Sequence, residues 1–396
     1  MTYRDIVAVS AVRTPLGRFG GTLRDVRVYE LGAVALRGAL DKSGLPANRV
    51  DEVVMGQCRQ TGSGPNPVRS AALLADIPSQ VPAFTLNMAC PSGMRATAVA
   101  LQSIATGAAQ AVLTGGMDSM STIPHIVRGL RFAPKRFGDV TIEDGWKDAT
   151  DPIAETSMGL SAERLAEKMQ ISRDEQDRFA FESQQRALRA ISDGHFRAEI
   201  VPVEIPAAFD HGPVSLAQDE TPRADTTLEK LAALPPAFSR NGTVTAGNSC
   251  TMADGAAAIA WAKRDLAHSL GIKPLFRTVA YAQLAVEGIT MGEGPALSIP
   301  KALDMAGMHL SDMDRIEVNE AFACQMIANQ RQLQWDPSRV NVHGGAIALG
   351  HPSGLSGARI IVTLYHALCA ADAEFGLAAI CGAGGVTSAI VIQREN

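Results

Sequence analysis

The sequence contains few aromatic residues and no long apolar run. Phe, Trp and Tyr make up 5% of the 396 residues, whereas hydrophobic residues make up 46% and glycine occupies 36 positions. No apolar run reaches the length of a membrane helix, and no signal-peptide stretch precedes Ile6-Val7-Ala8-Val9. This composition favours helices packed tightly against a buried sheet, in a chain long enough for two or three domains. We therefore expect a soluble, cytoplasmic protein without a membrane partner.

The sequence also lacks a large excess of one charge, and its cysteines do not occur in pairs. The formal net charge of −5 is small and provides no basic field, so we expect no nucleic-acid partner. The six cysteines show neither metal-site nor disulfide spacing, so we expect no metal and free thiols in a reducing compartment. Thiol chemistry is therefore available for catalysis.

Cys90 lies where a strand gives way to a helix. A short strand is predicted over 81–86, and small residues from Ala96 to Ala105 predict a buried helix. The free N–H groups and the positive end of the helix dipole favour a thiolate at Cys90. The alternative is a structural thiol, which is the more common fate of a free cysteine in a soluble protein.

His351 stands in the same context as Cys90. Each is followed by Pro-Ser-Gly, a helical stretch of small residues and an apolar strand that runs into glycines. Upstream, 35–54 and 299–318 repeat one order of helix, glycine turn and strand. We infer a duplicated α/β unit with a largely buried sheet, in which equivalent turns of two packed halves bring the thiol and the imidazole face to face.

Residues 121–245 differ from both halves in composition. Charge, Pro and Asp increase, helices are predicted over 161–170 and 173–194, and Ser172 with Glu175 forms a capping-box pattern. We interpret this stretch as an insertion that rests on the first half and helps to build a binding site. The predicted domains are a first half of 1–120 and 246–272, an inserted domain of 121–245, and a second half of 273–396.

Four polar groups lie at strand ends of the two halves: Cys90, Asn319, His351 and Cys381. A nucleophilic thiol needs a base, which His351 can supply, and Cys381 could carry a proton if its pKa lay near the working pH. Asn319 could position a water or donate to an oxyanion, together with N–H groups of the turn at 382–385. Taken singly, Asn319 and Cys381 are equally compatible with structural roles.

These residues stand in specific motifs: Asn-Met-Ala-Cys-Pro-Ser-Gly around Cys90, Asn-Glu-Ala-Phe from Asn319, Gly-Ala-Ile-Ala-Leu-Gly-His-Pro around His351, and Thr-Ala-Gly-Asn from Thr245. Over nearly its whole length the chain resembles the thiolases (acetyl-CoA C-acyltransferases). The resemblance implies an α/β thiolase fold with two βαβαβαββ halves in a five-layered αβαβα arrangement and an inserted loop domain over the coenzyme A site. It also implies a homodimer or homotetramer.

The activity that the resemblance implies is a ping-pong reaction. Thiolases cleave 3-ketoacyl-CoA or condense an acyl-CoA with acetyl-CoA, and coenzyme A species are their substrates rather than cofactors. By resemblance, Cys90 is the nucleophile that carries the acyl group as a thioester, and His351 is the base that activates the Cys90 thiol. Asn319 would fix a water in the oxyanion site, and Cys381 would exchange the α-proton of acetyl-CoA.

Further positions match the coenzyme A site of the family. Arg223 corresponds to an arginine near the nucleotide phosphates, and the pantetheine and acyl channel corresponds to Met158, Phe238, Ala246, Met291, Ala321 and Phe322. The chain departs from the family pattern at three places: Ser157 in place of a histidine, Ser249-Cys250 where a serine contacts pantetheine, and Ala383 within the final Cys-Gly-Ala-Gly-Gly.

Three other functions fit the sequence less well. A decarboxylating ketoacyl synthase would use a second histidine where this chain offers Cys381 and Asn319. A catalytically silent acyl-CoA-binding protein would lack Cys90, His351 or Cys381. A papain-like hydrolase also pairs cysteine with histidine but has no duplicated α/β order. Acyl chain length, physiological direction and oligomeric state stay open at this point.

Overall fold

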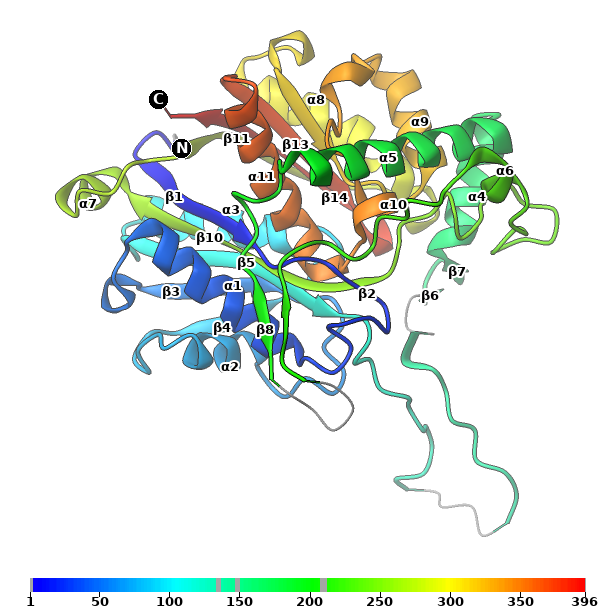
Figure 1. Ribbon diagram of the computed structural model, residues 1–396, viewed down its shortest axis with the longest axis horizontal. Helices are drawn as coiled ribbons and strands as arrows, with labels where there is room; N and C mark the ends of the chain where they lie inside the picture. Colours follow the sequence, from blue (N-terminus) through cyan, green and yellow to red (C-terminus); the bar gives the residue numbers. More distant parts are fainter. Residues whose placement is uncertain (1–2, 133–136, 147–149, 207–211, 396) are drawn as a thin grey trace.

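The computed structural model describes residues 3–132, 137–146, 150–206 and 212–395 (Figure 1). Its main feature is a ten-stranded sheet in the order β12-β13-β14-β11-β1-β10-β5-β3-β4, with β2 paired to β10. The strands are β1 (Ile6–Arg13), β2 (Gly17–Arg18), β3 (Glu52–Gly56), β4 (Ala83–Leu86), β5 (Ala111–Ser119), β10 (Ala253–Lys263), β11 (Phe276–Ala285), β12 (Arg315–Val318), β13 (Phe375–Cys381) and β14 (Val386–Arg394).

The helices lie close to where the hydrophobic pattern predicts them. The predicted capping box of Ser172 and Glu175 starts α5. The α-helices are α1 (Val28–Ser43), α2 (Pro67–Leu74), α3 (Ser92–Ala105), α4 (Met158–Lys168), α5 (Arg173–Asp193), α6 (Leu228–Ala232), α7 (Arg264–Ser269), α8 (Gly294–Ala306), α9 (Ala323–Leu333), α10 (Ala346–Leu349) and α11 (Ser353–Ala370). Short elements complete the described chain: the ribbons β6 (Thr150–Asp151) with β7 (Thr156–Ser157) and β8 (Val203–Ile205) with β9 (Val214–Leu216), and the 3-10 turns η1 (Ala47–Arg49), η3 (Gly288–Glu293), η4 (Leu310–Asp312), η5 (Pro337–Arg339) and η6 (Ala383–Gly385).

The sheet confirms the duplication inferred from the sequence. In the first half, β3 runs parallel to β5, β5 antiparallel to β10, and β10 antiparallel to β1. In the second half, β12, β13, β14 and β11 repeat these directions in the same order. A short antiparallel pairing of β1 with β11 joins the halves. The loops after β3 and after β12 are therefore topologically equivalent.

The five layers follow from which face of each strand is buried against which helix. On β10, Ile259 and Trp261 point into a central core shared with α3 and α11, whereas the alternate alanines point toward α1. On β14, Ile390 faces the same central core and Val391 faces α8. Because side chains of a strand alternate between faces, each half-sheet is covered on both sides. Helices α3 and α11 thus form a central layer between two half-sheets.

The inserted segment does not rest mainly on the first half, as the sequence led us to expect. Helices α4 and α5 lie against α9, α10 and η3 of the second half (Figure 1). The physical reason is the apolar face of α4, where Ala162 and Leu165 are buried in one cluster with Phe322 and Cys381. The insertion therefore covers the end of the sheet where the predicted catalytic residues lie.

Within the described part of the chain, no helix combines the length and apolar character needed to cross a lipid bilayer.

Candidate active site

Cys90 and His351 are brought together by the central helix pair. Cys90 lies in the turn between β4 and α3, and His351 lies in the turn between α10 and α11. The imidazole Nε2 is 3.3 Å from the Cys90 Sγ. Since α3 and α11 pack against each other, the duplicated turns place a thiol and a base in hydrogen-bond contact.

Hydrogen bonds around the ring assign the tautomer of His351. The Ser356 hydroxyl donates to the Pro352 carbonyl oxygen at 3.0 Å. Its oxygen lies 2.8 Å from the imidazole Nδ1 and therefore accepts the Nδ1 proton. Nε2 is left as an acceptor that faces Cys90. The ring is thus held ready to take a proton from the thiol.

The expected thiolate at Cys90 is wrong for the resting site. Burial raises the pKa of the Cys90 thiol to about 12, and the nearby Cys381 and Cys250 raise it further. The Ala383 N–H and the charge of Arg59 act in the opposite direction but do not offset burial. Burial also lowers the pKa of His351 to about 4. Desolvation outweighs the helix terminus, so the resting pair is a neutral thiol and a neutral imidazole.

Cys381 ends β13 and lines the same cavity as Cys90 and His351. Burial raises the pKa of its thiol to about 12, so the condition set for Cys381, a pKa near the working pH, is not met in the free protein. The cavity has a volume of about 620 Å³. Its lining includes most of the positions predicted for substrate contact: Met158, Phe238, Ser249, Cys250, Met291, Ala321, Phe322 and Ala383. Ser157, which replaces a family histidine, lines it as well.

Asn319 is fully buried beside the site but does not line the cavity. It follows β12, and its backbone N–H donates to the Ala379 carbonyl. Neither the nitrogen nor the oxygen of its side-chain amide has a hydrogen-bond partner among the described residues. Leaving a buried amide unpaired is costly, so Asn319 is better suited to a ligand or a bound water than to packing.

Arg223 and Ala246 are not part of the cavity lining. Both are exposed, and the Arg223 backbone N–H donates to the Gln184 side chain at 2.9 Å. They lie on the loops that flank α6, outside the catalytic cavity. From this position, Arg223 and Ala246 could contact only a distant part of a long ligand.

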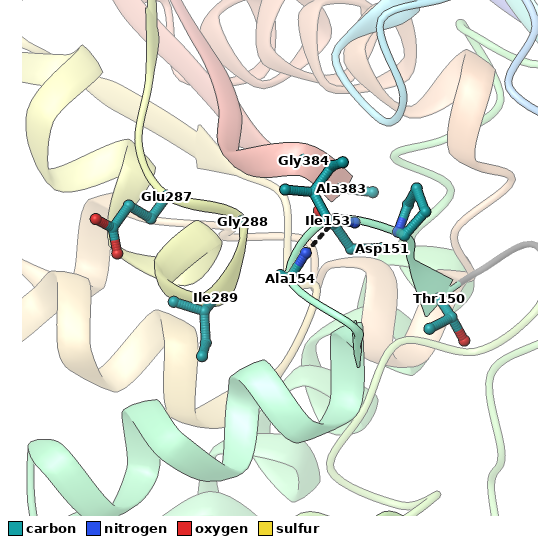
Figure 2. Close-up of a pocket in the computed structure, with 10 residues that line it drawn as sticks. Thr150, Asp151, Ile153, Ala154, Glu287, Gly288, Ile289, Ala383 and Gly384 are labelled. Carbon is teal, nitrogen blue, oxygen red and sulfur yellow. Dashed lines mark hydrogen bonds between the residues drawn. The ribbon is translucent and has the colours of Figure 1, made fainter.

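A second cavity, of about 730 Å³, adjoins the first (Figure 2). It is lined by residues 150–154, residues 287–289, Ala383 and Gly384, and it shares Thr150 and Ala383 with the catalytic cavity. Figure 2 shows the β6–β7 turn, in which the Asp151 carboxylate accepts the N–H groups of Ile153 and Ala154. The turn after Cys381 thus separates two neighbouring hollows.

Sequence reasoning missed several residues at this site. Ser356 orients His351. The Asp118 carboxylate accepts backbone N–H groups from Cys58, Arg59 and Gly354, which ties the loop after β3 to the first turn of α11. Arg59 itself lines the cavity. The duplication could have revealed the loop that carries Arg59. This loop follows β3 and is topologically equivalent to the loop that carries Asn319, so the repeat predicts that both loops face the same site.

A duplicated α/β fold that holds a cysteine–histidine pair and a second cysteine in one cavity is the arrangement of an acyl-transferring enzyme. Models of the thiolase N-terminal and C-terminal domains match residues 6–265 and 272–394. Acetyl-CoA acetyltransferases of Pseudomonas aeruginosa and Escherichia coli are 46% and 43% identical, each over 99% of this chain and 100% of the relative.

Solved structures agree. The Bacillus anthracis acetyl-CoA acetyltransferase has a TM-score of 0.96 at 39% identity, with both chains covered completely. The human mitochondrial 3-ketoacyl-CoA thiolase in complex with CoA has a TM-score of 0.95 at 40% identity, over 100% of this chain and 99% of that one. The chain belongs to the thiolase family and is an acyltransferase.

Proposed function

We propose that Cys90 carries the acyl group as a thioester in a ping-pong thiolase reaction, with His351 as its base and Cys381 as the acid–base of the carbon–carbon step. The observation that supports this most directly is the 3.3 Å contact of Cys90 Sγ with His351 Nε2 in a cavity that Cys381 also lines.

Acylation begins with two neutral partners. As the Cys90 sulfur attacks the C3 carbonyl of a 3-ketoacyl-CoA, its proton passes to His351 Nε2, which the Nδ1–H bond to Ser356 leaves free to accept it. A neutral pair needs no preformed charge separation in a buried site, and the imidazolium forms only as the thiol is consumed. The Ala383 N–H, which points at Cys90, lies near the developing oxyanion.

The second step concerns the carbon–carbon bond. When the C2–C3 bond of the substrate breaks, C2 leaves as the enolate of acetyl-CoA and takes a proton from the Cys381 thiol. In the other half-reaction, coenzyme A attacks the Cys90 thioester and gives its thiol proton to the Cys381 thiolate, while the released Cys90 sulfur recovers its proton from His351. Condensation runs these steps in reverse: the coenzyme A thiolate that leaves during acylation takes the Cys381 proton, and the Cys381 thiolate then removes the α-proton of acetyl-CoA. Enolate formation needs donors aimed at the thioester oxygen, a role that we assign to His351 and to a water held by Asn319.

The proposed substrates are coenzyme A thioesters, in keeping with the names of the relatives, and no further cofactor is required. The cavity wall around Met158, Phe238, Met291 and Phe322 is apolar and suits the pantetheine arm. Ser157, in place of a family histidine, accepts the Leu160 N–H as the N-cap of α4, so it also has a local structural role.

We also propose a homodimer or homotetramer in the cytoplasm, acting in lipid metabolism. The outer strand β4 exposes Phe84 beside Leu73 and Leu74 of α2. The segment after β5 extends away from the body and exposes Phe132 and Phe137 almost completely (Figure 1). Apolar surface of this kind is typical of an interface between subunits. The described cysteines are all free, as a reducing compartment allows.

The test is acylation by acetyl-CoA followed by mass spectrometry of the intact chain and its peptides. We expect one added acetyl group on Cys90. Cys381→Ala is expected to retain this label but to lose acetoacetyl-CoA formation, and Cys369→Ala, at an exposed cysteine outside the cavity, serves as the matched control. Absence of the label from folded protein would refute the proposal, and equal loss of both steps in Cys381→Ala would refute the role given to Cys381.

A further inference from the structure

Arg59 places a cation in the lining of the otherwise mostly apolar catalytic cavity. Arg59, in the loop after β3, lines the cavity together with Trp146. The guanidinium carbon lies 5.1 Å from the centroid of the Trp146 ring, which is a cation–π contact. Both side chains face the catalytic cavity from elements outside the apolar wall formed by α4 and η3.

One buried donor atom on each side chain of this pair lacks a partner among the described residues. Arg59 Nε and Trp146 Nε1 are buried and make no hydrogen bond with any residue that the structure describes. Asp118, an acid in the same loop network, already accepts three backbone N–H groups, one of them from Arg59 itself. Because both unpaired groups are donors only, their missing partner must be an acceptor, and a guanidinium prefers an anionic one.

The backbone holds Arg59 in place. Its N–H donates to Asp118 at 3.0 Å, and its carbonyl accepts from the Gln57 side chain at 2.8 Å. The aromatic face of Trp146 covers the guanidinium. A side chain fixed in this way loses little further freedom on binding, so a ligand gains most of the interaction free energy.

The position of Arg59 identifies which end of a ligand it meets. Arg59 lines the same cavity as Cys90 and His351, and the Asp118 carboxylate that accepts its N–H also accepts the N–H of Gly354, three residues after His351. The phosphates of coenzyme A lie at the far end of the pantetheine arm from the thioester. An anion beside the reacting carbon therefore belongs to the acyl group.

We propose that Arg59, held against Trp146, forms a subsite for a carboxylate at the end of the acyl chain, so that the preferred substrates are 3-oxo dicarboxylic mono-CoA thioesters. This inference rests on the proposed roles of Cys90 and His351. The carboxylate takes no part in the bond that breaks, so Arg59 sets substrate preference through binding and is not required for acylation itself.

The experiment compares thiolysis of two matched six-carbon substrates by the full-length enzyme, 3-oxohexanedioyl-CoA and 3-oxohexanoyl-CoA, which differ in the terminal carboxylate. The terminal methyl ester of the first substrate tests whether Arg59 recognises the charge or the shape of the terminal group. The eight-carbon pair tests how far from the reacting carbon the carboxylate must lie. We expect the wild type to prefer a dicarboxylic substrate of one length by about 10- to 100-fold in kcat/KM, the range of one charge-assisted hydrogen-bonded contact.

Arg59→Met is expected to abolish this preference by raising KM for the dicarboxylic substrate, so that the ratio of kcat/KM between the two substrates falls to about one, since uniform binding changes KM more than kcat. Arg59→Lys keeps the charge but not the planar fork and is expected to retain part of the preference. Arg49→Met, at an exposed arginine before β3, is the control for loss of a cation elsewhere.

The outcomes separate this inference from the proposed function. Equal rates for both substrates in the wild type, at both chain lengths, would overturn the carboxylate subsite while leaving the thiolase roles intact. Equal loss on both substrates in Arg59→Met would assign Arg59 a structural role and also overturn it. Failure of the wild type to acylate Cys90 with any of these thioesters would remove the proposed function itself.

Discussion

Ser356 offers a sharp test of how the base is prepared. Its hydroxyl is buried, accepts Nδ1–H from His351 and donates to the Pro352 carbonyl, so one side chain fixes both the ring orientation and the tautomer. Ser356→Ala removes this acceptor and replaces it with a methyl group. The imidazole then either buries an unpaired Nδ1–H or moves its proton to Nε2, where it can no longer accept the Cys90 proton.

The cost follows from either alternative. An unpaired buried N–H costs about 1–3 kcal/mol, which corresponds to a loss of about 5- to 150-fold in the rate of Cys90 acylation. The imidazole itself remains, so the loss should be smaller than that of His351→Ala. Ser356 touches no reacting atom and is a positioning residue. Its removal should therefore also alter the pH dependence of acylation, since the pKa of His351 depends on its hydrogen bonds.

Rapid-quench measurement of acetyl transfer from acetyl-CoA to Cys90 reports this rate directly. Thr363→Ala is the matched control, because Thr363 lies two turns further along α11, is equally buried and donates to Glu199. Both variants should lose similar stability in thermal unfolding, but only Ser356→Ala should slow acylation. An acylation rate within twofold of wild type in folded Ser356→Ala, with an unchanged pH profile, would refute the tautomer assignment.

Two further predictions concern titration and packing. Burial lowers the pKa of His351 to about 4, so kcat/KM should stay level from pH 8 down to about 5.5 and fall only as His351 takes a proton near pH 4. Burial raises the pKa of Cys90 to about 12, so the rate of Cys90 alkylation by iodoacetamide should keep rising with pH up to about 10. A plateau of alkylation near pH 7 would instead indicate a thiolate–imidazolium pair. Gly357→Ala places a Cβ 2.6 Å from the Met94 backbone nitrogen where α11 meets α3, so overpacking of about 1–3 kcal/mol should exceed the helix-propensity gain of about 1 kcal/mol and lower the melting temperature. An unchanged or higher melting temperature would show that the two helices can separate at low cost.

The sequence by itself determined the elements and their duplication. Hydrophobic patterns and capping signals predicted β4, α3, α4 and α5 within a few residues, because each of these signals is local. The repeat of Pro-Ser-Gly after Cys90 and after His351 was sufficient to pair two turns that are 261 positions apart. A repeated sequence order constrains topology, and topology alone placed both residues at one end of the two half-sheets.

Only the tertiary structure decided the electrostatics of the site. The helix N-terminus predicted a thiolate at Cys90, but a local sequence signal carries no information about desolvation, which depends on every layer packed around the turn. The sequence also could not determine which half the insertion covers, since the apolar face of α4 could pack against either. In the structure this face packs against the second half, in one cluster with Phe322 and Cys381. The contact of Ser356 with His351 and the contact of the Arg59 guanidinium with the Trp146 ring likewise depend on how distant loops meet. The amino-acid sequence determined which side chains were available, and their burial in the folded structure determined their charge states and hydrogen-bond partners.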